Sequence, residues 1–117
     1  MKSSFIKDIE FYVPEKVLTN DDLSTMMDTS DEWIKTRTGI HKRHTTGDTN
    51  MGPADLAVLA SNKLFDKLGM DKAEIDFVVF ATSTPDYYVP GSGALFQEKM
   101  GLDNIGCLLY TSPSPRD

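Results

Sequence analysis

Hydrophobic and polar positions alternate along the chain with two different periods, which indicates an α/β fold. Apolar residues from Phe5 to Val13 follow an imperfect period of two and predict a first strand that ends at Pro14. The continuous apolar run from Phe77 to Ala81 is typical of a central strand that is covered on both faces. Helical segments lie between and after these strands, and this order predicts a sheet that is at least partly parallel.

Two predicted helices in the first half of the chain have recognisable start and stop residues. The first begins at Thr19, which is followed three residues later by Asp22. The second begins at Thr29, which has capping-box spacing with Glu32, and it ends at Gly39 because glycine readily adopts the left-handed conformation. The inner face of the first helix is expected to consist of Leu23, Met26 and Met27.

The second half of the chain predicts two further helices. Residues 41–51 are polar and predict a loop. Pro53 suits the first position of a helix that ends at Gly69, and residues 94–100 predict another helix that also ends before a glycine. The apolar face of the longer helix has three- and four-residue spacing and consists of Ala57, Ala60, Leu64 and Leu68.

Composition narrows the class of protein. A chain of 117 residues is long enough for one domain at most, and its net charge of −6 argues against general nucleic-acid binding. No apolar run approaches the ~20 residues of a membrane span, and the N-terminus lacks the pattern of a signal peptide. A single cysteine excludes an internal disulfide, so a cytoplasmic protein is expected.

Residues 107–117, with the sequence CLLYTSPSPRD, do not continue the α/β pattern. A strand is expected to begin at Cys107, but the Ser-Pro-Ser-Pro stretch cannot continue a buried sheet. The peptide resembles the in-frame translation of a common transposon-end sequencing adaptor. We therefore expect residues 1–106 to be native and residues 107–117 to be derived from adaptor DNA, so that Cys107 is no nucleophile. The alternative is a natural, irregular C-terminus.

Segment 33–47 is the strongest candidate for binding chemistry. Trp33 and Arg37 are four residues apart and share one helical face. A nucleotide base can stack on an indole, and a guanidinium can hold phosphate. The alternative is a half-buried Trp that packs against the Arg stem beside a solvated basic loop. The segment contains no acidic residue and four basic ones, which are Lys35, Arg37, Lys42 and Arg43.

Other polar groups favour structural roles. His41 and His44 are three residues apart, but no third ligand is evident nearby, so no metal site is expected. Asp31 and Glu32 are neighbours on a helix and do not face each other, which favours capping over a catalytic pair. Residues 82–84 carry hydroxyls but have no base within sequence reach.

The segment TSDEWIKTRTGIHKR, residues 29–43, is similar to the N-terminal signature of the β-ketoacyl-acyl carrier protein synthase III family. The flanking segments YVPEKVLTNDDL and FVVFATSTPDYYVPGSGALFQEKMGL also resemble this family, so the resemblance covers residues 1–106. It implies part of the N-terminal half of a thiolase-like fold, a mixed sheet with covering helices, in truncated form.

The resemblance implies an acyltransferase that condenses an acyl-CoA, commonly acetyl-CoA, with malonyl-acyl carrier protein to start type II fatty-acid synthesis. It also implies a homodimer without a permanently bound cofactor. Trp33 matches the Trp that stacks on the adenine of coenzyme A, Arg37 matches the Arg that holds the nucleotide end, and Thr29 lies beside it. Val89 matches a position that reaches across the dimer interface towards the partner's acyl pocket.

The family's catalytic Cys, His and Asn have no counterpart in residues 1–106, so this chain is expected to be inactive by itself. Three alternatives stay open. One is a synthase-III-like enzyme of secondary metabolism that uses another acyl-CoA. Another is a non-catalytic coenzyme A-binding module, and the last is a complete small structural domain.

Overall fold

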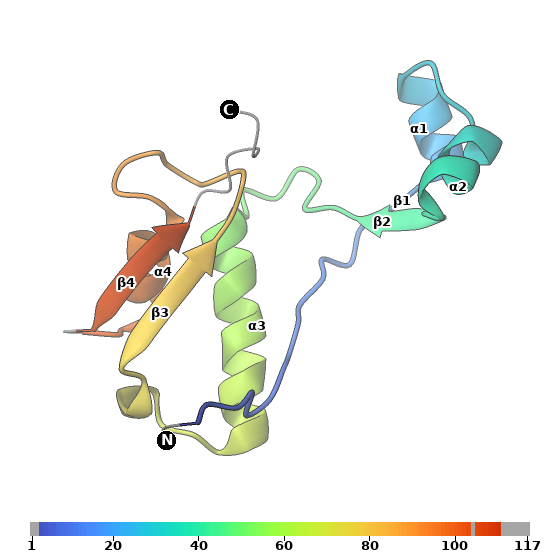
Figure 1. Cartoon of the computed structure of the whole chain (residues 1–117). Coiled ribbons are helices and arrows are strands. Elements are labelled where there is room, and N and C mark those ends of the chain that lie inside the picture. The colour runs from blue at the N-terminus through green and yellow to red at the C-terminus, as the bar shows by residue number, and fades with distance from the viewer. Residues whose placement is uncertain (1–2, 104, 111–117) are drawn as a thin grey trace. The chain divides into compact units, whose positions relative to one another are not determined.

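The computed structural model describes residues 3–103 and 105–110, and these form two compact units (Figure 1). One unit runs from Val13 to Asn50, and the other combines the residues before it with those from Met51 onward. The first contains β1 (Val17–Thr19), α1 (Asn20–Met26), α2 (Asp31–Thr38) and β2 (Lys42–His44). The second contains α3 (Pro53–Leu68), the 3₁₀ turn η1 (Lys72–Glu74), β3 (Phe77–Ala81), α4 (Ser92–Met100) and β4 (Gly106–Tyr110).

The larger unit is built on a parallel pair of strands. β3 pairs with β4 in a register that runs from Phe77 opposite Gly106 to Ala81 opposite Tyr110. Helices α3 and α4 cover one face of this pair (Figure 1). The prediction of a partly parallel α/β sheet is therefore confirmed. β4 also begins one residue before Cys107, so the pairing involves both sides of the expected native boundary, whereas residues 111–117 lie outside the described residues.

The core of this unit lies between the sheet and its helices. Phe80 on β3 and Phe96 on α4 have ring centroids 5.7 Å apart, and both side chains are buried. The aromatic pair is surrounded by residues that are also buried, which are Ala54, Met100 and Leu102. Burial of these side chains stabilises the unit, because the hydrophobic effect scales with the apolar area removed from water.

β3 is covered on one face only, so the prediction of a strand buried on both faces is wrong for the described residues. The side chains of Phe77 and Val79 are 56% and 65% exposed. They alternate with Val78 and Phe80, which face the helices. A continuous apolar run predicts two covered faces, but within residues 3–103 and 105–110 no element packs against the second face.

The predicted strand over 5–13 is also wrong, because this segment has no strand partner in the described part of the chain and stays irregular. Phe5 and Ile6 are largely exposed. Side chains of α3 hold the segment instead: Lys67 pairs with Asp8 at 2.8 Å, and Lys63 donates to the Phe11 carbonyl at 2.9 Å. The hydrogen bond from Lys67 lowers the pKa of Asp8. Alternation alone does not make a strand, since a strand needs a neighbour for its backbone hydrogen bonds.

In the smaller unit, the helix start at Thr19 is confirmed. Its hydroxyl accepts the Asp22 N–H at 3.2 Å, and the Asp22 carboxylate accepts the Thr19 N–H at 2.8 Å. The predicted inner face is wrong for Met26 and Met27, whose side chains are 67% and 57% exposed. Leu23 is half-buried. The unit contains too few packed layers to cover all the apolar residues of a two-turn helix.

Part of the predicted loop over 41–51 is a strand. β2 pairs antiparallel with β1, with Leu18 opposite Arg43. Three polar residues, Lys42 to His44, carry no hydrophobic alternation that would reveal such a strand. Pairing with β1 is a tertiary contact, and a short edge ribbon can form without an apolar face.

The starts and ends of α3 and α4 follow the sequence closely. Pro53 is the first residue of α3, and Gly69 ends this helix in the left-handed conformation at φ 59°. A residue far along the sequence also binds a backbone N–H group in the first turn of α3: the Asp86 carboxylate accepts a hydrogen bond from the Ala54 N–H at 3.1 Å. α4 begins at Ser92, two residues earlier than expected. None of the helices in residues 3–103 and 105–110 has the length and apolar composition needed to cross a membrane.

Candidate functional site

Helix α2 begins one residue later than predicted, so the assignment of Thr29 as its cap is wrong. Ser30 is the N-cap, with extended backbone at φ −140°, and its hydroxyl accepts the Trp33 N–H at 3.1 Å. Trp33 therefore occupies the third helical position, and Glu32 does not close a capping box. Gly39 ends the helix in the left-handed conformation at φ 70°, as predicted.

Trp33 and Arg37 meet on the exposed face of α2. The Arg37 Cζ atom lies 4.9 Å from the centroid of the Trp33 ring, a cation–π distance. The Trp33 side chain is 53% exposed, so one surface of the indole is available to solvent. A shallow pocket with a volume of about 400 Å³ lies against this face. Its lining residues are Ser30, Glu32, Trp33, Thr36 and Arg37.

Some basic residues around this face are paired with other side chains of the chain, and others, within the described residues, are free to meet a ligand. Lys35 pairs with Asp31 at 2.6 Å, and hydrogen bonds from Lys35 and then Asn20 lower the pKa of Asp31. Arg43 donates to the Asn20 side chain at 2.6 Å and is half-buried, so it is a structural residue rather than an outward phosphate ligand.

None of the ion pairs found in the described residues involves Arg37. Exposed Lys42 has no ion pair among the described residues either, but it does not line the pocket. The Arg37 guanidinium is therefore the charge best placed to meet an anion in this pocket.

The two histidines have separate surroundings. The His44 Nδ1 atom lies 2.5 Å from the Pro14 carbonyl oxygen, which ties β2 to the segment before β1. His41 is exposed. Among residues 3–103 and 105–110, no group of three or more His, Cys, Asp or Glu side chains is arranged to hold a metal ion.

Val89 lies in the larger unit, in the loop between β3 and α4. Its side chain is 86% exposed, as is most of Tyr88. The loop is anchored where it enters α4, because the Asp86 N–H donates to the buried Ser92 hydroxyl at 2.7 Å. Thr29 is half-buried and precedes the cap of α2 in the smaller unit.

Cys107 has the environment of a structural thiol. It lies in β4 opposite Val78 and is half-buried. Burial raises the pKa of this thiol, which favours the neutral form over the nucleophilic thiolate. An activated cysteine typically lies at a helix N-terminus or beside a cation, and a position within a strand supplies neither.

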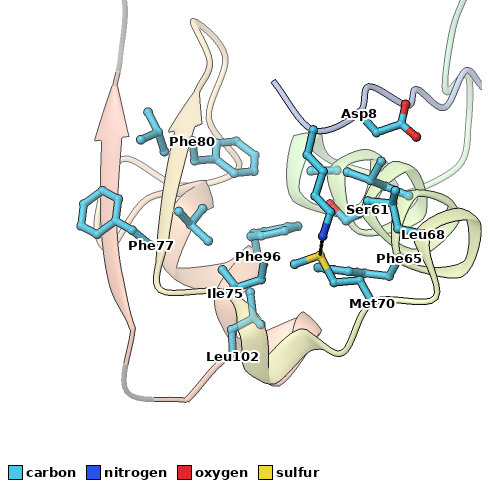
Figure 2. A pocket seen from close by; sticks show the side chains of 15 residues that line it. Asp8, Ser61, Phe65, Leu68, Met70, Ile75, Phe77, Phe80, Phe96 and Leu102 are labelled. Atoms are coloured by element: carbon cyan, nitrogen blue, oxygen red, sulfur yellow. Dashed lines mark hydrogen bonds between the residues drawn. The ribbon is translucent and has the colours of Figure 1, made fainter. Parts of the chain in front are cut away.

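A second cavity of about 400 Å³ lies in the larger unit between α3 and β3 (Figure 2). Figure 2 shows Phe65 and Leu68 on one side of this space and Phe80 and Phe96 on the other. Its walls are mainly apolar, and Asp8 is the only carboxylate among the lining residues. Such a space has no arrangement of groups for acid–base or nucleophilic chemistry. The α2 face is therefore the better candidate site.

Comparison with known proteins identifies relatives of this chain. No model of a known protein family matches the chain. The β-ketoacyl-acyl carrier protein synthase III of Xanthomonas campestris is 49% identical over 96 residues, which make up 82% of this chain and 29% of that protein. The chain is homologous to β-ketoacyl-acyl carrier protein synthase III. It spans less than a third of the length of this relative.

Solved structures show the same relationship. The synthase III of Thermus thermophilus matches 92% of this chain and 33% of its own, with a TM-score of 0.79 and 40% identity. The priming β-ketosynthase of the R1128 polyketide pathway matches 89% of this chain and 31% of its own, with a TM-score of 0.79 and 31% identity. The chain therefore has the mixed α/β architecture of part of the thiolase-like synthase III fold, as predicted.

The sequence identified Trp33 and Arg37 as candidate site residues. It did not identify Ser30 as the N-cap of α2 or Asn20 as a partner of both ends of this helix. Ser30 follows Thr29, and only Thr29 has the capping-box spacing to Glu32, so spacing favoured the wrong hydroxyl. Asn20 follows the Thr19 cap, where a polar residue ordinarily indicates solvent exposure. Its burial and its partners appear only when α2 and β2 are folded around it.

Proposed function

We propose that the exposed face of α2 binds the nucleotide end of coenzyme A. The carrying observation is the stacked arrangement of Trp33 and Arg37 over an open pocket. Adenine is flat and stacks on an indole, whereas the phosphates of coenzyme A are anionic and accept hydrogen bonds from a guanidinium. The two side chains together match the two chemical parts of this nucleotide.

The homology supports a specific reaction for the intact enzyme. We propose that the parent protein condenses an acyl-CoA, with acetyl-CoA the first choice, with malonyl-acyl carrier protein. Loss of carbon dioxide from the malonyl unit leaves an enolate, which attacks the carbonyl carbon of the acyl thioester in a decarboxylative Claisen condensation; the carbonyl–sulfur bond breaks and the thiol leaves. This acyltransferase would initiate type II fatty-acid synthesis, as a cytoplasmic homodimer without a resident cofactor. The support is the name carried by the 49% identical relative from Xanthomonas campestris.

Thr29 and Val89 complete the proposed substrate contacts. Thr29 precedes the cap of α2, and we assign it a contact beside the nucleotide end. Val89 is exposed on an anchored loop, and we assign it a role in acyl-chain choice from across a dimer interface. A side chain in that role would act through the volume of the acyl pocket.

We also propose that this chain does not catalyse the condensation by itself. Its single cysteine lies in a strand, and burial raises the pKa of the thiol, so an acyl-enzyme is not expected. Incubation with acetyl-CoA and malonyl-acyl carrier protein should yield no β-ketoacyl product, measured by mass spectrometry of the carrier protein. Any measurable turnover would contradict this proposal, and its loss in Cys107→Ala would then assign the chemistry to that thiol.

A second candidate substrate class has its own support. The 31% identical priming β-ketosynthase belongs to a polyketide pathway, so the parent protein is alternatively a synthase-III-like enzyme of secondary metabolism with another acyl-CoA. Both candidates share the coenzyme A nucleotide and differ in the acyl group. The α2 site serves either of them.

Arg37 provides the test of nucleotide binding in this chain. Arg37→Ala should weaken coenzyme A binding by about tenfold or more, since a charge-assisted hydrogen bond contributes roughly 1.5–3 kcal/mol. The loss should shrink as salt is raised, because exposed charges are screened. Isothermal calorimetry at two salt concentrations measures both effects.

Lys35→Ala is the matched control, because it removes the same charge from the same helix at a side chain that is paired with Asp31. Its affinity should stay within about twofold of the native value, as is usual for an exposed pair. Equal losses in the two variants would indicate attraction by net charge alone and would refute a specific site. An Arg37→Ala isotherm that matches the native one would do the same.

A further inference from the structure

Asn20 is the most deeply buried polar side chain of the smaller unit, with 1% of its surface exposed. Its Nδ2 atom donates to the Asp31 carboxylate at 2.9 Å and to the Ile40 carbonyl at 2.8 Å. Its Oδ1 atom accepts from the Arg43 guanidinium at 2.6 Å. Both donor hydrogens and one acceptor lone pair are therefore used, which is nearly the full capacity of an amide.

The partners of Asn20 lie at both ends of α2. Asp31 is the first residue of this helix, and Ile40 directly follows its Gly39 cap. One amide at the start of α1 thus holds the beginning and the end of the helix that carries the candidate site. Arg43 extends the link to the β1–β2 ribbon, where its Nη1 atom also lies 3.4 Å from the carbonyl oxygen of Leu18.

Among the described residues of the smaller unit, few other groups hold α2 in place. The helix has eight residues, and Ile34 is the only one of them that is buried. A helix this short is marginal without tertiary contacts, because isolated helices below ~12–15 residues are barely stable in water. The orientation of α2 therefore depends on the packing of Ile34 and on the hydrogen bonds of Asn20.

We propose that Asn20 is a positioning residue for the Trp33–Arg37 face: it sets the affinity for the coenzyme A nucleotide without touching the ligand. This inference rests on the proposed function of α2. Asparagine suits the role because the same side chain donates to a carboxylate and a carbonyl while it accepts from a guanidinium. Aspartate has nearly the same shape, but it has no donor when ionised and would place a second negative charge beside Asp31.

Asn20→Asp is the direct test, measured well below the unfolding temperature. We expect coenzyme A affinity to fall by about tenfold, because two buried hydrogen bonds are lost and α2 is released at both ends. The near-ultraviolet circular dichroism of Trp33, the sole tryptophan, should weaken in the ligand-free protein as its surroundings become less fixed. If Asn20→Asp does not fold, Asp31→Ala is a milder second variant. Because Asp31→Ala also removes the ion pair with Lys35, Lys35→Ala controls for the loss of that pair.

Leu23→Ala is the control for a purely structural loss, because this half-buried residue of α1 makes no hydrogen bond to α2 through its side chain. It should lower stability but leave affinity within about twofold of native, because the hydrogen bonds from Asn20 to both ends of α2 stay in place. Native affinity in Asn20→Asp, or an equal loss in Leu23→Ala, would overturn the positioning role. If the native chain binds no coenzyme A, the proposed function fails. The positioning role is tested separately in the ligand-free protein, where an unchanged Trp33 dichroism band in Asn20→Asp would refute it.

Discussion

Replacing Trp33 by alanine should abolish the coenzyme A binding that calorimetry detects. The indole offers the stacking surface for adenine, and base–aromatic stacking contributes roughly 1–3 kcal/mol per base. Its loss also removes the ring beneath the Arg37 guanidinium, which lies 4.9 Å from the ring centroid. The affinity should therefore fall by about 10- to 100-fold or more. Unlike the loss in Arg37→Ala, this one should persist at high salt, because stacking is not screened.

Two controls separate stacking from unfolding. The Trp33 side chain is 53% exposed, so Trp33→Ala should change the free energy of unfolding little. Trp33→Phe keeps a flat ring and should retain part of the affinity. Pantetheine, which lacks the adenine nucleotide, should bind equally to the native chain and to Trp33→Ala. An unchanged coenzyme A isotherm in the alanine variant would exclude α2 as the nucleotide site.

Replacing Phe96 by alanine should cause the largest loss of stability in the larger unit. Phe96 is 7% exposed and packs against Phe80 with ring centroids 5.7 Å apart. Truncation of a buried Phe costs about 3–5 kcal/mol, because the apolar transfer energy is lost and a cavity remains. That is a large part of the ~5–15 kcal/mol by which a domain is ordinarily stable. Urea unfolding followed by far-ultraviolet circular dichroism measures the change.

Phe77→Ala is the matched control, since it removes the same side chain from the exposed face of β3. Phe77 is 56% exposed, so its truncation should cost about 1 kcal/mol or less. A difference of at least ~2 kcal/mol between the two variants is therefore expected. Equal losses would mean that the second face of β3 is as well packed as the first.

Local signals in the sequence were sufficient for most element starts and stops. The structure has four of these signals where the sequence predicts them: the capping box at Thr19, the helix ends at Gly39 and Gly69, and Pro53 at the start of α3. These features depend on hydrogen bonds and backbone angles within a few residues, so they are encoded locally. The choice between Thr29 and Ser30 failed because both are favoured N-cap residues, and the capping-box spacing to Glu32 pointed to Thr29.

Strand assignments were less reliable because a strand is completed by a distant partner. Residues 5–13 have the alternation of a strand but lie beside α3 through Lys63 and Lys67. Residues 42–44 have no such pattern and nevertheless pair with β1. In both cases the partner, rather than the segment itself, decided the structure.

The sequence by itself determined the α/β class, the parallel strand near residue 77 and the Trp33–Arg37 spacing that puts an indole and a guanidinium on one helical face. The tertiary structure decided which basic residues remain available, because Arg43 turns inward to Asn20 while Arg37 stays over the ring. It also decided that Asn20 is buried between both ends of α2. Periodicity specifies which side chains share a face, whereas burial and hydrogen-bond partners depend on elements that the chain brings together only on folding.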